Sequence, residues 1–99
     1  MKSLVLRSLP DTRPEGATID YRDVVQQVIR APLKPEAGVG IEEMRQSIRV
    51  LDALDKANGT LELEDADWQH LVAKTRAMQW AFVDRRILTF IDDVLEGSA

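Results

Sequence analysis

The chain contains no cysteine, a single histidine and few aromatic residues: two Trp, one Tyr and two Phe among 99 residues. The lack of cysteine excludes a disulfide framework, a thiolate zinc site and a thiol nucleophile. No apolar run approaches the roughly 20 residues that span a bilayer, and the apolar stretch after Lys2 is too short for a signal peptide. These absences favour an intracellular protein.

What the chain does contain is typical of one globular domain over residues 1–99. Apolar residues make up 44% of the sequence and charged residues 30%, a balance that separates it from disordered chains. The formal net charge of -4 argues against direct binding to nucleic-acid phosphates.

Hydrophobic periodicity predicts a mainly helical fold of the α+β class. Four helices are expected at about residues 20–30, 41–57, 65–77 and 84–95, and two short strands at residues 3–7 and 60–63. The order is therefore β-α-α-β-α-α, and residues 8–18, with two prolines and a glycine, are expected to form a loop. If the two strands pair, they need helix cover, because an isolated two-stranded sheet is marginal in water.

Each helix carries an apolar row that is expected to face the core. The row of the helix at 41–57 has five members at helical spacing: Ile41, Met44, Ile48, Leu51 and Leu54. The row of the helix at 65–77 consists of Trp68, Leu71, Val72 and Thr75. Residues in the middle of their rows are expected to be buried: Leu51, Leu71, Ile87 and Ile91.

Asp67, His70 and Lys74 share the other side of the helix at 65–77. An Asp-x-x-His pair supplies two metal ligands, whereas a working site needs three or four ligands with outer-shell support. We therefore expect these three residues to form an exposed polar face, with no metal and no cofactor.

Four acids and no base occur between residues 62 and 67: Glu62, Glu64, Asp65 and Asp67. Acids at a helix start complement the helix dipole, which gives the run a purely structural explanation. The same charges can imitate phosphates toward a basic partner. The sequence leaves both interpretations open.

Trp80 lies in the connection between the last two expected helices. A large aromatic residue in such a place either anchors an interface or fills the core. A small domain needs its aromatic residues inside, which favours the core. Trp80 is kept as an interaction candidate.

The last expected helix has its charges in an unfavourable order. Arg85 and Arg86 are in its first turn and Asp92, Asp93 and Glu96 in its last, whereas the helix dipole favours acids first and bases last. Each such term is only ~0.3–1 kcal/mol, so the charges are either incidental or used by a partner. On the second interpretation they form a contact surface, and exchanging Asp92 and Asp93 for Lys leaves the free domain no less stable.

The segments at residues 61–68 and 84–95, with Trp80 between them, resemble small proteins encoded by tailed phages and prophages. The similarity covers about residues 60–99 and contains no motif of known chemistry. The resemblance implies a small accessory, assembly or regulatory protein, in the cytoplasm of a bacterial host or in a virion.

The function expected from these observations is non-enzymatic protein–protein interaction, as in a phage-type assembly or regulatory factor. The partner is another protein or a second copy of the chain, with no direct contact to nucleic acid or membrane. The alternative is an acidic inhibitor that occupies the basic nucleic-acid-binding surface of a partner protein. An enzyme is not expected, because no nucleophile, acid–base pair or metal set converges.

Overall fold

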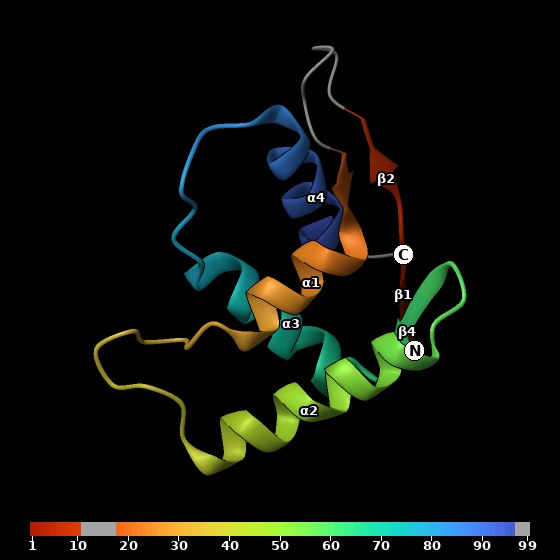
Figure 1. Cartoon of the computed structure of the whole chain (residues 1–99). Helices are drawn as coiled ribbons and strands as arrows, with labels where there is room; N and C mark the ends of the chain where they lie inside the picture. Colours follow the sequence, from red (N-terminus) through yellow and green to blue (C-terminus); the bar gives the residue numbers. More distant parts are fainter. Residues whose placement is uncertain (11–17, 97–99) are drawn as a thin grey trace.

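The computed structural model describes residues 1–10 and 18–96, and within them it contains four helices and four short strands (Figure 1). In chain order the elements are β1 (Lys2–Val5), β2 (Ser8–Leu9), β3 (Ile19–Asp20), α1 (Tyr21–Arg30), α2 (Ile41–Lys56), β4 (Thr60–Leu63), α3 (Asp65–Ala77) and α4 (Arg85–Glu96). The mainly helical α+β fold is confirmed, and the expected order β-α-α-β-α-α is matched except for the two additional short strands β2 and β3. None of these helices is long and apolar enough to cross a membrane.

The strands β2 and β3 are the elements that the sequence does not predict. They pair antiparallel, with Ser8 opposite Asp20 and Leu9 opposite Ile19, at the two ends of the segment that was expected to be a loop. Two residues are too few to show a period, so no sequence pattern indicates them. The expected loop itself lies largely at residues 11–17, outside the described residues.

The other sheet joins the start of the chain to its middle. Strands β1 and β4 pair antiparallel, with Leu4 opposite Leu61 and Lys2 opposite Leu63. Alternation along the strands turns Leu4, Leu61 and Leu63 into the core, where each is at most 4% exposed. Both α2 and α3 contact β4, which provides the helix cover that a two-stranded sheet needs.

Helix α1 lies between α4 and α2 in the view of Figure 1 and contacts both α2 and α3. One face of the helix carries apolar residues at helical spacing, and all five are buried: Tyr21, Val24, Val25, Val28 and Ile29. Asp20 caps the helix, because its carboxylate accepts the backbone N–H of Arg22 at 3.0 Å. Four of the five buried residues are β-branched and poor helix formers, so the packing of this one face holds the helix.

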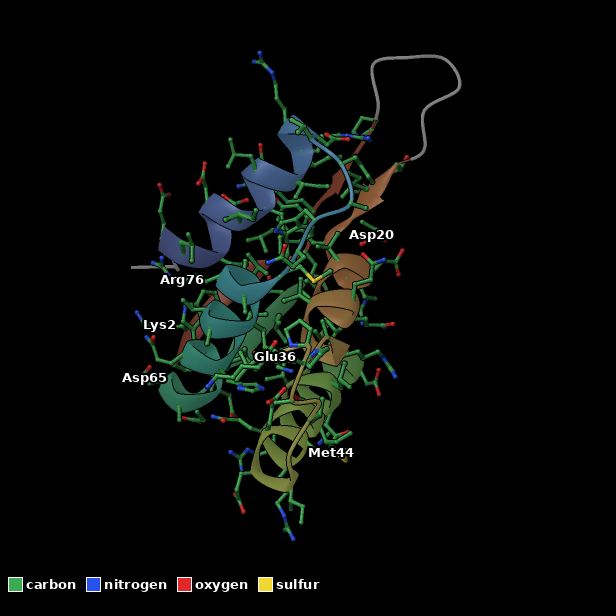
Figure 2. All side chains as sticks on the ribbon, turned by 90° about the vertical axis from the view of Figure 1, so that its left-hand side faces the viewer. Lys2, Asp20, Glu36, Met44, Asp65 and Arg76 are labelled. Carbon is green, nitrogen blue, oxygen red and sulfur yellow. The ribbon has the colours of Figure 1, made fainter. Side chains whose placement is uncertain are left out.

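Helix α2 faces the core with a different side from the one that its apolar row predicts. Its buried residues are Ser47, Val50 and Leu54, whereas Ile41, Met44 and Ile48 are 71%, 54% and 48% exposed. In Figure 2 Met44 lies on the side of α2 opposite to α3. Only the C-terminal end of the predicted row reaches the core, through Leu54 and the half-buried Leu51.

The other burial predictions are also confirmed only in part. Leu71 and Ile87 are buried as expected, but Leu51 and Ile91 are only partly buried at the edge of the core. The prediction of an exposed polar face on α3 is wrong, because none of its three members is exposed and Asp67 is partly buried. His70 is 7% exposed and Lys74 is 2% exposed, so both lie inside the domain.

Two truncations on α2 test which side faces inward. Replacing the fully buried Val50 with Ala is expected to lower the free energy of unfolding by about 2 kcal/mol, since it removes two methyl groups from a closed site. Replacing Ile48 with Ala is expected to change it by less than about 0.5 kcal/mol, because the lost contacts are few and Ala favours the helix. Urea unfolding measures both values, and a larger loss for Ile48→Ala would reverse the assignment.

Candidate functional site

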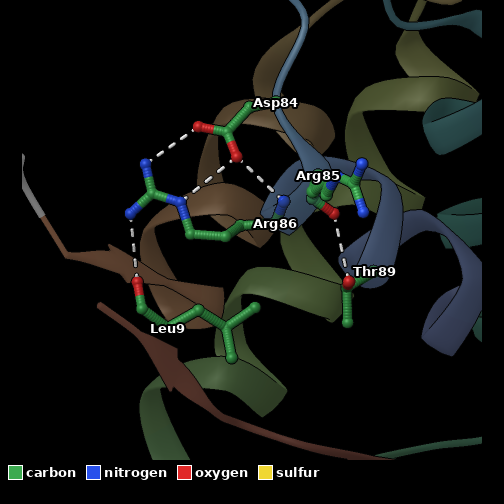
Figure 3. A network of polar contacts seen from close by, with 5 residues as sticks. All are labelled: Leu9, Asp84, Arg85, Arg86 and Thr89. Atoms are coloured by element: carbon green, nitrogen blue, oxygen red, sulfur yellow. Dashed lines mark hydrogen bonds and ion pairs between the residues drawn. The ribbon is translucent and has the colours of Figure 1, made fainter. Parts of the chain in front are cut away.

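The five charged residues of α4 do not act as one surface. Arg86 turns toward the start of its own helix, where its guanidinium contacts both carboxylate oxygens of Asp84 at 2.8 and 3.2 Å (Figure 3). It also donates to the carbonyl oxygen of Leu9 at 3.2 Å, which ties α4 to β2. Asp84 accepts the backbone N–H of Arg86 at 2.8 Å and so caps the helix.

Asp93 is also used inside the domain. The hydroxyl of Tyr21 donates to the Asp93 carboxylate at 2.6 Å, and the guanidinium of Arg7 lies 3.9 Å from the same oxygen. Burial, followed by this hydrogen bond to a carboxylate, raises the pKa of Tyr21 above its usual value. The ring of Tyr21 packs edge-on against Phe90 of α4, with centroids 5.0 Å apart. Asp93 therefore stabilises the contact between α1 and α4.

The other charged residues of α4 face outward. Arg85, Asp92 and Glu96 are exposed, and Leu88 between them is 57% exposed. Figure 3 shows the Arg85 side chain directed away from the Asp84–Arg86 network. Trp80 is partly buried and packs against the core, in agreement with the core interpretation. The contact surface expected from the sequence is thus reduced to Arg85, Asp92 and Glu96, which together with the exposed Leu88 are called here the α4 outer face.

A buried polar cluster, which the sequence does not predict, joins α1, α2 and α3. The ammonium group of Lys74 lies 2.6 Å from Glu43 on α2 and donates to the carbonyl oxygen of Ala31 at the end of α1. Glu43 also accepts the backbone N–H of Leu33 at 3.1 Å. One lysine and one glutamate therefore fix the end of α1, the following loop and the first half of α2.

The same cluster continues to a histidine and a serine. The Nε2 atom of His70 lies 2.9 Å from the hydroxyl oxygen of Ser47, and both residues are buried. Burial, and then the nearby charge of Lys74, lowers the pKa of His70, whereas the hydrogen bond from Lys74 lowers the pKa of Glu43. At neutral pH the cluster therefore contains a neutral imidazole beside a charged Lys–Glu pair.

A serine beside a histidine is the arrangement of a nucleophile and its base, but the surroundings of Ser47 and His70 do not suit that chemistry. Both side chains are closed in between helices. Two surface clefts among the described residues lie elsewhere, one between β3 and α1 and one where β4, the end of α2 and Met1 meet. We interpret the cluster as a structural tie.

Spacing on the two helices is the signal that would have revealed this cluster. Glu43 and Ser47 are four residues apart on α2, and His70 and Lys74 are four residues apart on α3. Each pair therefore lies on one side of its helix, and the two pairs oppose one another. Across the described residues, no group of three or more His, Asp or Glu side chains is arranged to hold a metal ion.

Two further surface features lie outside both the buried cluster and the α4 outer face. The first is the apolar row Ile41, Met44 and Ile48, called here the α2 outer row, which faces solvent. The second is the acidic run, in which Asp67 pairs with Arg49 at 3.2 Å while Glu62, Glu64 and Asp65 stay exposed. Comparisons with protein-family models, with curated proteins and with solved structures find no match to the chain.

The lowered pKa of His70 gives the domain a predicted pH dependence. Below pH 6.5, the usual pKa of histidine, the unfolded chain takes up a proton more readily than the folded one. The free energy of unfolding therefore decreases as the pH is lowered. Glu43 adds to this loss only below its usual value of 4.5. We expect the melting temperature to decrease between pH 7.5 and 5.5, and the variant His70→Gln to remove most of that decrease. Because the chain has one histidine, an unchanged slope in the variant would refute this assignment.

The two neighbouring acids of α4 are expected to respond differently to the same substitution. Asp93→Lys takes the acceptor from the Tyr21 hydroxyl and is expected to cost about 1–3 kcal/mol of unfolding free energy. Asp92→Lys changes an exposed side chain and is expected to stay within about 0.5 kcal/mol of the wild type. We therefore keep the sequence-based prediction of no loss for Asp92 and replace it for Asp93. Equal urea-unfolding midpoints for the two variants would contradict this division.

Proposed function

We propose that the chain is a non-enzymatic protein–protein interaction module. The observation that carries this proposal is the α2 outer row, three large apolar side chains at helical spacing that no described part of the domain covers. Single exposed apolar residues are ordinary, whereas a continuous row on one helix is typical of helix-in-groove recognition. The row lies on a regular helix of 16 residues, so it needs no rearrangement to meet a partner.

The buried cluster explains how this row stays at the surface. The first half of α2 is anchored on its inner side by Glu43 and Ser47, whose partners are Lys74 and His70 on α3. Polar contacts thus hold a helix segment that would otherwise be held by burying its apolar residues. A rigidly held helix presents its outer side chains to a partner at a smaller entropy cost than a mobile one.

Charge defines the kind of partner that fits this row. Arg45 is exposed, four residues after Ile41 and three before Ile48. At helical spacing this places its side chain beside the row, between these two residues. The partner that we propose is therefore an apolar helix or groove from another protein, with a carboxylate facing Arg45. The resemblance of residues 60–99 to phage-encoded accessory proteins suggests an assembly or regulatory factor, acting in the bacterial cytoplasm or the virion.

The acidic inhibitor remains a second candidate because three acids of the run at 62–67 are exposed. Such an inhibitor uses Glu62, Glu64 and Asp65 rather than the α2 outer row. Its binding weakens steeply with salt, whereas apolar contacts are insensitive to salt. The salt dependence of partner binding therefore separates the two proposals.

A polar version of the row tests the proposed function. The variant Ile41→Gln, Met44→Gln, Ile48→Gln keeps the charge and the helix propensity of α2, so its melting temperature is expected to change little. Immobilised wild type is expected to retain a specific partner from an extract of the cells that express the protein. The variant is expected to retain at least about tenfold less of that partner, because the apolar contact is lost.

The matched control is Leu88→Gln, which exchanges one exposed apolar residue for Gln on α4. It is expected to retain the same partner as the wild type. Quantitative mass spectrometry of the retained proteins compares all three chains at two salt concentrations. Equal retention by the wild type and the triple variant contradicts the proposal, and binding abolished by salt alone favours the acidic inhibitor.

A further inference from the structure

The α4 outer face carries its charges in an order that a lone helix disfavours. Arg85 is at the N-terminal end and Asp92 and Glu96 are toward the C-terminal end, against the helix dipole. The structure explains the other two charges of this helix, because Arg86 contacts Asp84 and Asp93 contacts Tyr21. Within residues 1–10 and 18–96, the side chains of Arg85, Asp92 and Glu96 have no ion-pair partner.

These residues lie on one side of the helix. Arg85 and Asp92 are seven residues apart, which at about 100° per residue brings them within about 20° of the same direction. Leu88 lies between them and is 57% exposed, and Leu95 continues the apolar flank one turn beyond Asp92. Phe82, just before the helix, is 61% exposed. The face thus combines a base at one end, acids at the other and apolar side chains along its flank.

Such a face is complementary to itself. A second copy of α4 that runs antiparallel, with the two-fold axis between Leu88 and Thr89, places Arg85 of each copy opposite Asp92 of the other. Symmetry makes this contact twice, as in every isologous interface. Glu96 of each copy then approaches the N-terminal end of the other α4, where the dipole favours an acid. The order that is unfavourable within one helix becomes favourable between two.

We propose that the chain forms a symmetric dimer through antiparallel pairing of the α4 outer faces. The occupant of this face is a second copy because its charges match their own reversed order, and a parallel copy would oppose Arg85 with Arg85. The apolar flank adds Leu88 at the centre and Phe82 near Leu95 at each end. The pairing goes beyond the proposed function and uses a different helix, so each holds or fails by itself.

Charge exchange at two positions tests the geometry. Wild type is expected to show reversible dimerisation in sedimentation equilibrium between about 10 µM and 1 mM, weakened by added salt. The variants Arg85→Asp and Asp92→Arg each oppose like charges, so each alone is expected to associate at least about tenfold more weakly. Both substitutions favour the helix dipole, so neither variant is expected to lose stability.

Mixing the two variants is the decisive measurement. In a mixed antiparallel dimer, both contacts between positions 85 and 92 again join opposite charges, so equimolar Arg85→Asp and Asp92→Arg are expected to associate like the wild type. The double variant Arg85→Asp, Asp92→Arg is expected to dimerise with itself. The control Arg45→Asp makes the same charge change on α2 and is expected to leave dimerisation unchanged.

Three results overturn the proposal. Wild type that stays monomeric up to about 1 mM excludes the dimer. Mixed variants that remain monomeric exclude the antiparallel register even if wild type associates. Loss of association in the Arg45→Asp control assigns the contact to α2. A monomeric wild type or a monomeric mixture of the two variants leaves retention of a partner by the α2 outer row unaffected. The dimer and the interaction module can therefore be refuted separately.

Discussion

The ammonium group of Lys74 is the interaction on which the arrangement of three helices depends. It is nearly inaccessible to water, and it contacts Glu43 of α2 and the carbonyl oxygen of Ala31, which directly follows α1. A buried charge without partners is strongly unfavourable, so the cluster is stable only when all of its members are in place. The end of α1, the loop after it and the start of α2 are thereby fixed to α3 together.

The same tie decides which surface the domain offers to the outside. The inner side of α2 changes along its length, from Glu43 and Ser47 in its first half to Val50 and Leu54 in its second. Where the contacts are polar, the apolar residues Ile41 and Met44 point outward. The α2 outer row is therefore a consequence of how the helix is anchored.

Helix α4 shows how one set of charges is divided by its surroundings. Arg86 reaches the carbonyl of Leu9 on β2, and Asp93 accepts from Tyr21 on α1, so these two charges hold the helix in the domain. Arg85 and Asp92 are next to them in sequence but point away. Adjacent helical residues differ by about 100° in direction, which is enough to assign one to the interior and the other to solvent.

The sequence by itself determined the helices, their order and the face of α1, because caps and hydrophobic period act over one or two turns. It also favoured a core position for Trp80 while leaving an interface role open. Only the tertiary structure decided which side of α2 is buried and that His70 and Lys74 lie inside. A polar side chain lies at the surface unless the core supplies a hydrogen-bond or ion-pair partner for it. Glu43 and Ser47 come from a helix more than 20 residues away, and no local pattern records that contact.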